Sequence, residues 1–175
     1  MRSLSRILAC AAVVLPAAAP AAWAQPADGP AEIVLVDKMT RFVEWPRGTE
    51  GDRPFVLAVI GRSPFGEVLD DYFSRHALKN RPVTIRYLRQ IEDLGEADLL
   101  FICASEKPRL PQILAHLKGR PVLTVADCEG FASAGVMVGF VPDGGKISFE
   151  INPFPIREAG IRVRPDFLQL AKIVP

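Results

Sequence analysis

The most enzyme-like stretch of the sequence is Gly61-Arg62-Ser63-Pro64-Phe65-Gly66. It follows an apolar run and precedes a segment with helical spacing, and open α/β sheets bind ligands where a strand passes into a helix. Phe65, however, occupies the position of the second glycine of a Gly-x-Ser-x-Gly nucleophile motif. Ser63 is better placed to cap the helix, with Pro64 in its first turn. Gly61 and Ser63 therefore form a candidate ligand or anion site and not a catalytic one.

Histidines are too few and too poorly spaced for a metal or hydrolytic centre. His76 and His116 are the only two in the sequence, and neither has a Cys, His or acidic partner at ligand spacing. His76 lies at the far end of the helix that Ser63 caps, roughly 18 Å away at about 1.5 Å per residue, so only His116 remains for a triad. Dinucleotide and Walker motifs are absent. We expect no metal, no cofactor and no enzymatic activity.

Cys103 and Cys128 lie at or just past the ends of two apolar runs that predict buried strands. If those strands are neighbours, their ends come within reach of a disulfide. Closing a loop of about 25 residues would stabilise the fold by roughly 3 kcal/mol on the chain-entropy model. Two buried free thiols are the alternative. Catalytic thiol chemistry is less favoured than either, because there is no Cys-x-x-Cys.

The first 24 residues have the pattern of a secretory signal peptide. Arg2 and Arg6 precede an apolar run over 7–22, and Ala22-Trp23-Ala24 supplies the small residues before a cleavage site. Cleavage there removes two of the 21 basic residues and none of the 20 acidic ones, which leaves a formal charge of −1. Nothing in that balance calls for nucleic acid, and no later apolar run approaches the roughly 18 residues of a membrane span. We expect a periplasmic protein whose mature chain does not span a membrane.

The remaining residues have the pattern of one α/β domain over 31–175, after a loose polar leader at 25–30. Helical spacing predicts an N-terminal helix over 31–44, which Trp45-Pro46 ends. Further helices are predicted from Ser63 to about His76, and at 108–117, 156–159 and 165–173. Buried parallel strands are predicted at 55–60, 98–103 and 121–126, and an edge strand at 83–87. We expect a three-layer sandwich with a mainly parallel sheet, an N-terminal helix and a C-terminal antiparallel hairpin plus helices.

The clearest strand is Lys146-Ile147-Ser148-Phe149-Glu150-Ile151-Asn152, in which apolar and polar residues alternate. With the Gly144-Gly145 turn and the run 135–141 before it, this segment predicts a β-hairpin. Its polar face carries Glu150 and Asn152. That face is either a solvated edge of the sheet or a recognition surface, and the pattern leaves both interpretations open.

Seven short blocks of the sequence resemble those of a known family in their order and spacing. They are Arg41-Phe42-Val43-Glu44-Trp45-Pro46, Val59-Ile60-Gly61 with Ser63-Pro64-Phe65-Gly66, Val122-Leu123-Thr124-Val125, Gly135, Phe149-Glu150-Ile151-Asn152, Gly160-Ile161-Arg162-Val163 and Leu168-Gln169-Leu170-Ala171. Together they resemble the YfiR family (YfiR/HmsC-like) of periplasmic proteins. The resemblance covers about residues 31–174.

The resemblance implies a binding protein that represses the periplasmic part of an inner-membrane diguanylate cyclase, and so lowers cyclic-di-GMP and biofilm formation. It also implies a homodimer. Related proteins occur beside other membrane sensors such as histidine kinases, so the alternative is a periplasmic small-ligand-binding module that feeds such a sensor. The best-known member has redox-sensitive disulfides, whereas the two mature cysteines here, Cys103 and Cys128, allow one bridge at most.

A partner-binding surface is expected where polar strand residues lie beside arginines and aromatic anchors. Arginine suits such interfaces because its planar fork makes paired hydrogen bonds, and large aromatic side chains fill pockets on the partner. An internal role is the alternative for each residue, with Trp45 covering the core and Glu150 pairing with an arginine. The candidates are Glu150, Asn152, Arg157, Arg162, Arg164, Trp45 and Phe154.

Overall fold

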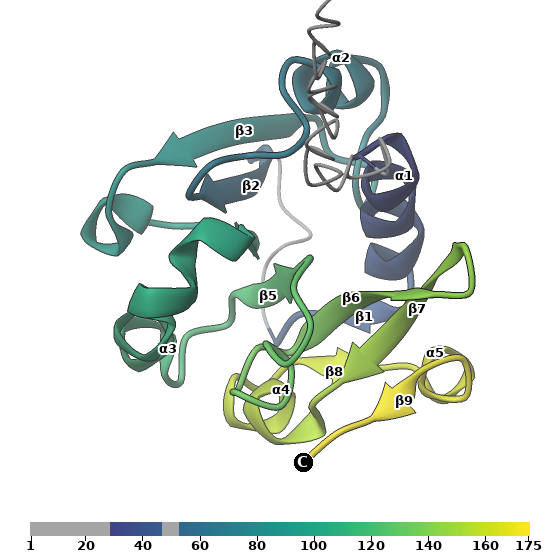
Figure 1. The fold of residues 1–175 in the computed structure, drawn as a ribbon. Helices are drawn as coiled ribbons and strands as arrows, with labels where there is room; N and C mark the ends of the chain where they lie inside the picture. The colour runs from purple at the N-terminus through teal and green to yellow at the C-terminus, as the bar shows by residue number, and fades with distance from the viewer. Residues whose placement is uncertain (1–28, 47–52) are drawn as a thin grey trace, which may run out of the picture.

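The computed structural model describes residues 29–46 and 53–175 (Figure 1). The predicted signal peptide, the first four residues of the predicted leader and most of the loop after Pro46 lie outside the described residues. The elements are α1 (Gly29–Thr40), β1 (Val43–Glu44), β2 (Phe55–Ile60), α2 (Val68–Arg75), β3 (Val83–Leu88), η1 (Ile91–Leu94), β4 (Leu99–Ile102), η2 (Ala104–Arg109), α3 (Leu110–Leu117), β5 (Leu123–Ala126), β6 (Val138–Asp143), β7 (Lys146–Ile151), α4 (Pro153–Glu158), β8 (Arg162–Val163), α5 (Pro165–Leu168) and β9 (Lys172–Ile173).

Seven strands form one sheet in the order β3-β2-β4-β5-β6-β7-β9, and β1 pairs with β8 in a separate two-stranded sheet. Strands β2 to β6 run parallel, β7 returns antiparallel to β6, and β9 runs parallel to β7. From β2 the chain steps outward to β3 and then back across to β4, so the direction of winding reverses beside β2. This α/β architecture, mainly parallel with an antiparallel hairpin, confirms the predicted fold class.

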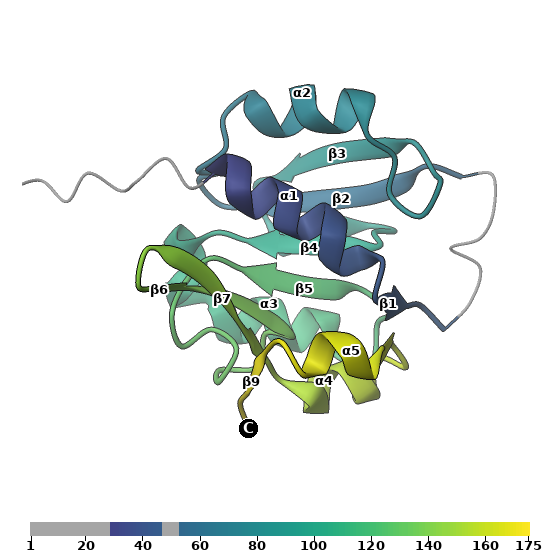
Figure 2. The same cartoon turned by 90° about the vertical axis from the view of Figure 1, so that its right-hand side faces the viewer.

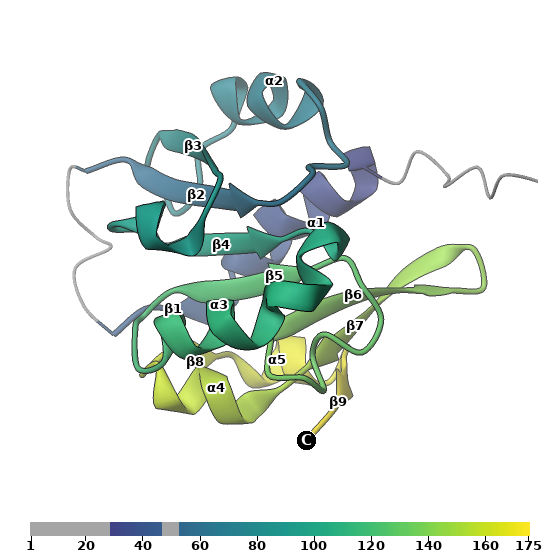
Figure 3. The same cartoon turned by 60° about the vertical axis from the view of Figure 1, so that its left-hand side comes forward.

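Two apolar clusters cover opposite faces of the sheet, because successive strand residues point to opposite sides. Leu57 and Val59 of β2 belong to the first cluster, whereas Ala58 and Ile60 belong to the second. The helix α1 covers the first face and α3 covers the second (Figures 2 and 3). Continuous apolar runs such as 55–60 are therefore explained by burial on both sides, which gives the three layers.

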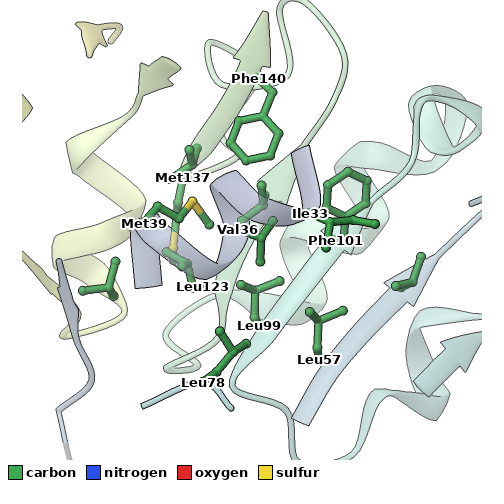
Figure 4. Close-up of a cluster of buried hydrophobic side chains, with 14 of the residues drawn as sticks. Ile33, Val36, Met39, Leu57, Leu78, Leu99, Phe101, Leu123, Met137 and Phe140 are labelled. Carbon is green, nitrogen blue, oxygen red and sulfur yellow. The ribbon is translucent and has the colours of Figure 1, made fainter. Parts of the chain in front are cut away.

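The helix α1 reaches the sheet through three side chains at helical spacing, Ile33, Val36 and Met39, each at most 2% exposed. Figure 4 shows them above Leu57, Leu99 and Leu123 of the central strands. Burial of side chains of this size stabilises by about 1.5–3 kcal/mol each relative to exposure. This contact fixes the N-terminal helix on the sheet.

Helix boundaries differ from the predictions most at α1, α2 and α5, and less at α3 and α4. Helix α1 ends at Thr40, and Val43–Glu44, predicted as helix, pairs as β1 with Val163 and Arg162. Helix α2 begins at Val68, after a turn in which Ser63 Oγ accepts a hydrogen bond from the Phe65 amide at 3.2 Å. The predicted last helix is a single turn, α5, after which Lys172–Ile173 joins the sheet as β9. In two of these places, long-range strand pairing overrides local helical spacing.

Within residues 29–46 and 53–175, no helix has both the length and the apolar character that crossing a bilayer requires.

Candidate functional site

Glu150 lies on β7 opposite Lys172 of β9. Its carboxylate accepts a 2.9 Å hydrogen bond from Lys172 Nζ, and the residue is only 7% exposed. At Glu150 the structure therefore favours the internal role, the alternative given for this residue, over a solvated edge. The reason is that β9, which local spacing predicts as helix, covers the edge of β7. The internal partner is a lysine 22 residues away and not an arginine.

Asn152 is 4% exposed, and both the nitrogen and the oxygen of its side-chain amide form hydrogen bonds. Nδ2 donates to the carbonyl oxygens of Ala132 and Pro175, both at 3.0 Å, and Oδ1 accepts from the Phe154 amide at 3.1 Å. The last contact caps α4, as asparagine commonly does at a helix N-terminus. Asn152 thus joins three segments that are distant in the sequence, and the little of it that is exposed lines a hollow that Phe154 also lines.

Trp45 also has an internal contact set. Its indole Nε1 donates to the Asp98 carbonyl oxygen at 2.9 Å, and its ring lies edge-on to Phe55 at 5.6 Å between centroids. The Asp98 carboxylate in turn accepts hydrogen bonds from Arg53, Arg81 and the Val56 amide. Trp45 therefore covers the amino-terminal edge of the sheet, next to a buried ion-pair network. This agrees with the alternative that Trp45 covers the core and is not a partner anchor.

Phe154 and Arg157 lie on α4 and are exposed, with 59% of Phe154 accessible. Phe154 borders a hollow of about 410 Å³ between α3 and α4, whose lining includes Leu114, Leu117 and the charged Lys118 and Glu158. An exposed ring beside a mainly apolar hollow is the arrangement that interface anchors commonly show. Phe154 and Arg157 are the two of the seven predicted partner-binding residues that lie on the same helix, α4.

Arg162 lies in β8 and Arg164 follows that strand, beside the N-terminal strand β1. Arg162 pairs with Glu44 at 3.2 Å across the β1–β8 pair, and its side chain is 82% exposed. Arg164 pairs with Asp166 at 2.7 Å, and its guanidinium lies 5.3 Å from the Phe42 ring centroid. Exposed ion pairs of this kind contribute at most about 1 kcal/mol to stability. Both guanidinium groups are therefore accessible to another molecule.

Cys103 and Cys128 are free thiols in the structure. Cys103 belongs to the apolar cluster on the α1 face, whereas Cys128 packs against the cluster on the opposite face. The disulfide, one of the two alternatives that the sequence left open, is not formed, because the two side chains point to opposite sides of the sheet. Burial raises the pKa of Cys103 to about 12, and it also raises the pKa of Cys128.

Gly61 and Ser63 lie at the carboxyl edge of the sheet where the winding reverses, which is where open sheets commonly bind ligands. A Cβ atom at Gly61 would lie only 2.5 Å from Ser105 Oγ and 2.8 Å from Glu106 Cγ. Side chains of η2 therefore occupy the space next to Gly61. The predicted helix cap is also wrong, because α2 begins four residues after Pro64 with the acidic Glu67 at its N-cap. An anion site at Gly61 and Ser63 gains no support from this geometry.

Histidine chemistry is equally unsupported by the geometry. His76 stacks on Tyr72 at 4.0 Å and lies 2.7 Å from the Tyr72 carbonyl oxygen through Nδ1. His116 is exposed on α3. Across the described residues, no group of three or more His, Cys, Asp or Glu side chains is arranged to hold a metal ion.

A sheet wound in both directions from β2, with helices on each face, defines this molecule as an open three-layer α/β protein. The chain belongs to the YfiR/HmsC-like family, whose model matches residues 31–172. At family level this match supports a periplasmic regulator of a diguanylate cyclase. The family assignment predicted from the ordered sequence blocks is therefore confirmed.

A similar fold occurs in a crystal structure of the ABC domain in complex with L-Trp from Streptococcus pneumonia. The TM-score is 0.55 and the sequence identity is 12% over 82% of this chain. The chain spans 59% of the length of that structure. At this identity the likeness describes the shared α/β fold alone.

Proposed function

We propose that the mature chain is a periplasmic repressor that binds the periplasmic domain of an inner-membrane diguanylate cyclase, and so lowers cyclic-di-GMP and biofilm formation. The observation that carries this proposal is the family match over residues 31–172. The signal-peptide pattern of residues 1–24 supports the location, because it would export the chain to the compartment where such a domain is exposed.

The partner-binding surface that we propose consists of Phe154 and Arg157 on α4, together with Arg162 and Arg164. Phe154 is a large apolar side chain left 59% exposed, beside a hollow of about 410 Å³. The three arginines add positive charge that can pair with acidic residues of the partner. Truncating an aromatic residue that is a hot spot of an interface costs about 2 kcal/mol or more of binding energy, whereas rim charges chiefly affect the association rate.

Glu150, Asn152 and Trp45 enter this proposal indirectly. Their side chains bond within the fold, so we expect substitutions there to affect partner binding through stability and not through lost contacts. The predicted homodimer stays a prediction, to be measured by the molar mass of the mature chain in solution.

The experiment is co-purification of the mature chain with the membrane diguanylate cyclase of the same cell, together with cyclic-di-GMP measurement. We expect Phe154→Ala and Arg157→Glu to weaken co-purification and raise cyclic-di-GMP while the thermal midpoint stays near that of the wild type. Matched controls are Leu170→Ala, another exposed apolar residue, and Arg75→Glu, an exposed arginine on α2. Unchanged cyclic-di-GMP on deletion of the gene, with no cyclase recovered, would overturn the proposal.

A further inference from the structure

The hollow between α3 and α4 has a largely apolar interior. In Figure 3, α4 lies below α3, and the hollow of about 410 Å³ lies between them. Its two buried polar side chains already form hydrogen bonds within the fold. Thr124 accepts a bond from the Met137 amide at 2.9 Å, and Asn152 forms the three bonds described above. An apolar side chain is therefore the guest that this interior favours, because a polar one would exchange its hydration for few free partners.

Small residues keep the hollow open. Ala115 of α3 and Ala134 of the turn before β6 are exposed, and both line the hollow. Gly135 lines it as well, with a φ of 115° and a Cβ position only 3.1 Å from Leu114 Cδ1. Larger side chains at Ala115 or Ala134 would occupy space that is now empty. Single substitutions at exposed positions can therefore fill the hollow.

The rim of the hollow is rigid at Phe154. This residue lies in the first turn of α4, between Pro153 and Pro155, and proline fixes its own backbone angle φ. The Phe154 amide donates a hydrogen bond to Asn152 Oδ1 at 3.1 Å, which holds the turn in place. A residue that is already ordered loses little conformational entropy when a partner covers it. The exposed ring of Phe154 is therefore a preorganised contact.

Two opposite charges flank the hollow. Lys118 follows α3 and Glu158 ends α4, and both side chains are exposed and line the hollow. Within the described part of the chain, neither residue takes part in an ion pair. Unpaired charges at a rim select partners of opposite charge and repel those of like charge. The hollow thus fits an apolar side chain with an acidic residue on one side and a basic residue on the other.

We propose that this hollow receives one large apolar side chain from the periplasmic domain of the cyclase, with an acidic residue of that domain beside Lys118 and a basic residue beside Glu158. A protein surface fits better than a free small molecule, because the ring of Phe154 and both charges lie at the rim, where a larger surface covers them together. This inference rests on the proposed function, and it adds the chemistry of the partner segment and two residues that select it.

Filling the hollow tests the apolar contact, with co-purification of the cyclase as the measurement. Ala115→Trp and Ala134→Trp fill the hollow, whereas His116→Trp and Ser133→Trp add the same side chain at neighbouring exposed positions outside the lining. We expect the first two to lower the recovered cyclase by at least about tenfold and the controls to leave it unchanged. Thermal midpoints verify that the variants remain folded, and Ala115→Leu, a smaller filling, decides if a tryptophan variant unfolds.

Charge reversal tests the rim. Lys118→Glu and Glu158→Lys should each lower recovery by about fivefold at low salt, and this loss should shrink as the salt concentration rises, because salt screens exposed charges. The loss caused by the tryptophan variants should persist at high salt. Lys107→Glu and Glu96→Lys, which reverse exposed charges outside the lining, are the controls and should leave recovery unchanged.

The outcomes distinguish this inference from the proposed function. If the wild type recovers the cyclase and the folded variants with a filled hollow recover it equally, the inference is overturned while the proposed function stands. Charge reversals that have no more effect than their controls would overturn the selection by Lys118 and Glu158. Failure of the wild type to recover a cyclase would overturn both the inference and the proposed function.

Discussion

Glu150 and Lys172 face each other across the parallel pair β7–β9, with 2.9 Å between the carboxylate oxygen and the ammonium nitrogen. The carboxylate is mostly buried, with 9% of its side chain exposed, whereas the lysine side chain is 72% exposed. The hydrogen bond with Glu150 is the main cause that raises the pKa of Lys172. This pair attaches the last residues of the chain to the sheet.

Lys172→Met should lower the urea midpoint of unfolding, because it leaves the Glu150 carboxylate buried without its partner. Glu150→Gln in the same chain should restore part of the loss by removing that charge. The control is Lys146→Met, which removes an exposed lysine from β7, the strand that carries Glu150. It should have little effect. A midpoint for Lys172→Met equal to that of the control would contradict the prediction.

The same pair predicts a pH dependence. Because the pKa of Lys172 is raised in the folded state above its ordinary value of 10.5, its contribution to stability is fully present below that value. The contribution should disappear as the pH rises through the raised pKa. The difference in urea midpoint between wild type and Lys172→Met, measured at neutral pH and again in the strongly alkaline range, should therefore shrink.

Asn152→Ala should destabilise the fold by about 2–3 kcal/mol, because three hydrogen bonds are lost and buried carbonyl groups lose their donor. Asn152→Asp keeps an oxygen that can cap α4 but removes both donations, to Ala132 and Pro175. Comparing the two variants in denaturant unfolding separates capping from the link between segments. If Asn152→Asp unfolds at the wild-type midpoint, capping alone explains the residue.

Gly61→Ala should destabilise the fold by several kcal/mol, since a positive φ of 99° combines with a Cβ position 2.5 Å from Ser105 Oγ. Gly144→Ala is the matched control, with φ of 54° and no atom within 4 Å of its Cβ position. We expect about 1–2 kcal/mol for the control, the usual cost of the left-handed conformation. Similar thermal midpoints for the two variants would show that Ser105 and Glu106 move aside.

Cys128 should react with an aromatic disulfide reagent much faster than Cys103 under native conditions. Cys103 is 1% exposed with its pKa raised by burial to about 12, whereas Cys128 is partly exposed. The thiolate is the reactive form, so both burial and pKa favour reaction at Cys128. Mass spectrometry after brief labelling identifies the site. A mass lower by two hydrogens and no labelling would instead indicate a disulfide.

The partial success of the sequence predictions has a physical explanation. Strands 55–60 and 146–151 were predictable because burial on both faces or on one face leaves a pattern in adjacent residues. The role of Lys172 was not predictable, because its partner lies 22 residues away and the segment 165–173 has helical spacing. Asn152 was predicted to be a partner-binding residue and not the cap of α4, and its bonds to Ala132 and Pro175 leave no pattern in the adjacent residues.

By itself, the sequence determined the α/β class, the order of strands and helices from β2 to β7, and the family, because each depends on local periodicity or on blocks in order along the chain. Only the tertiary structure decided which polar residues are accessible. Glu150 and Asn152 alternate correctly for an open face, yet β9 and the Ala132 turn cover them. The accessibility of a side chain depends on contacts between segments that are distant in the sequence, and the spacing of neighbouring residues does not predict those contacts.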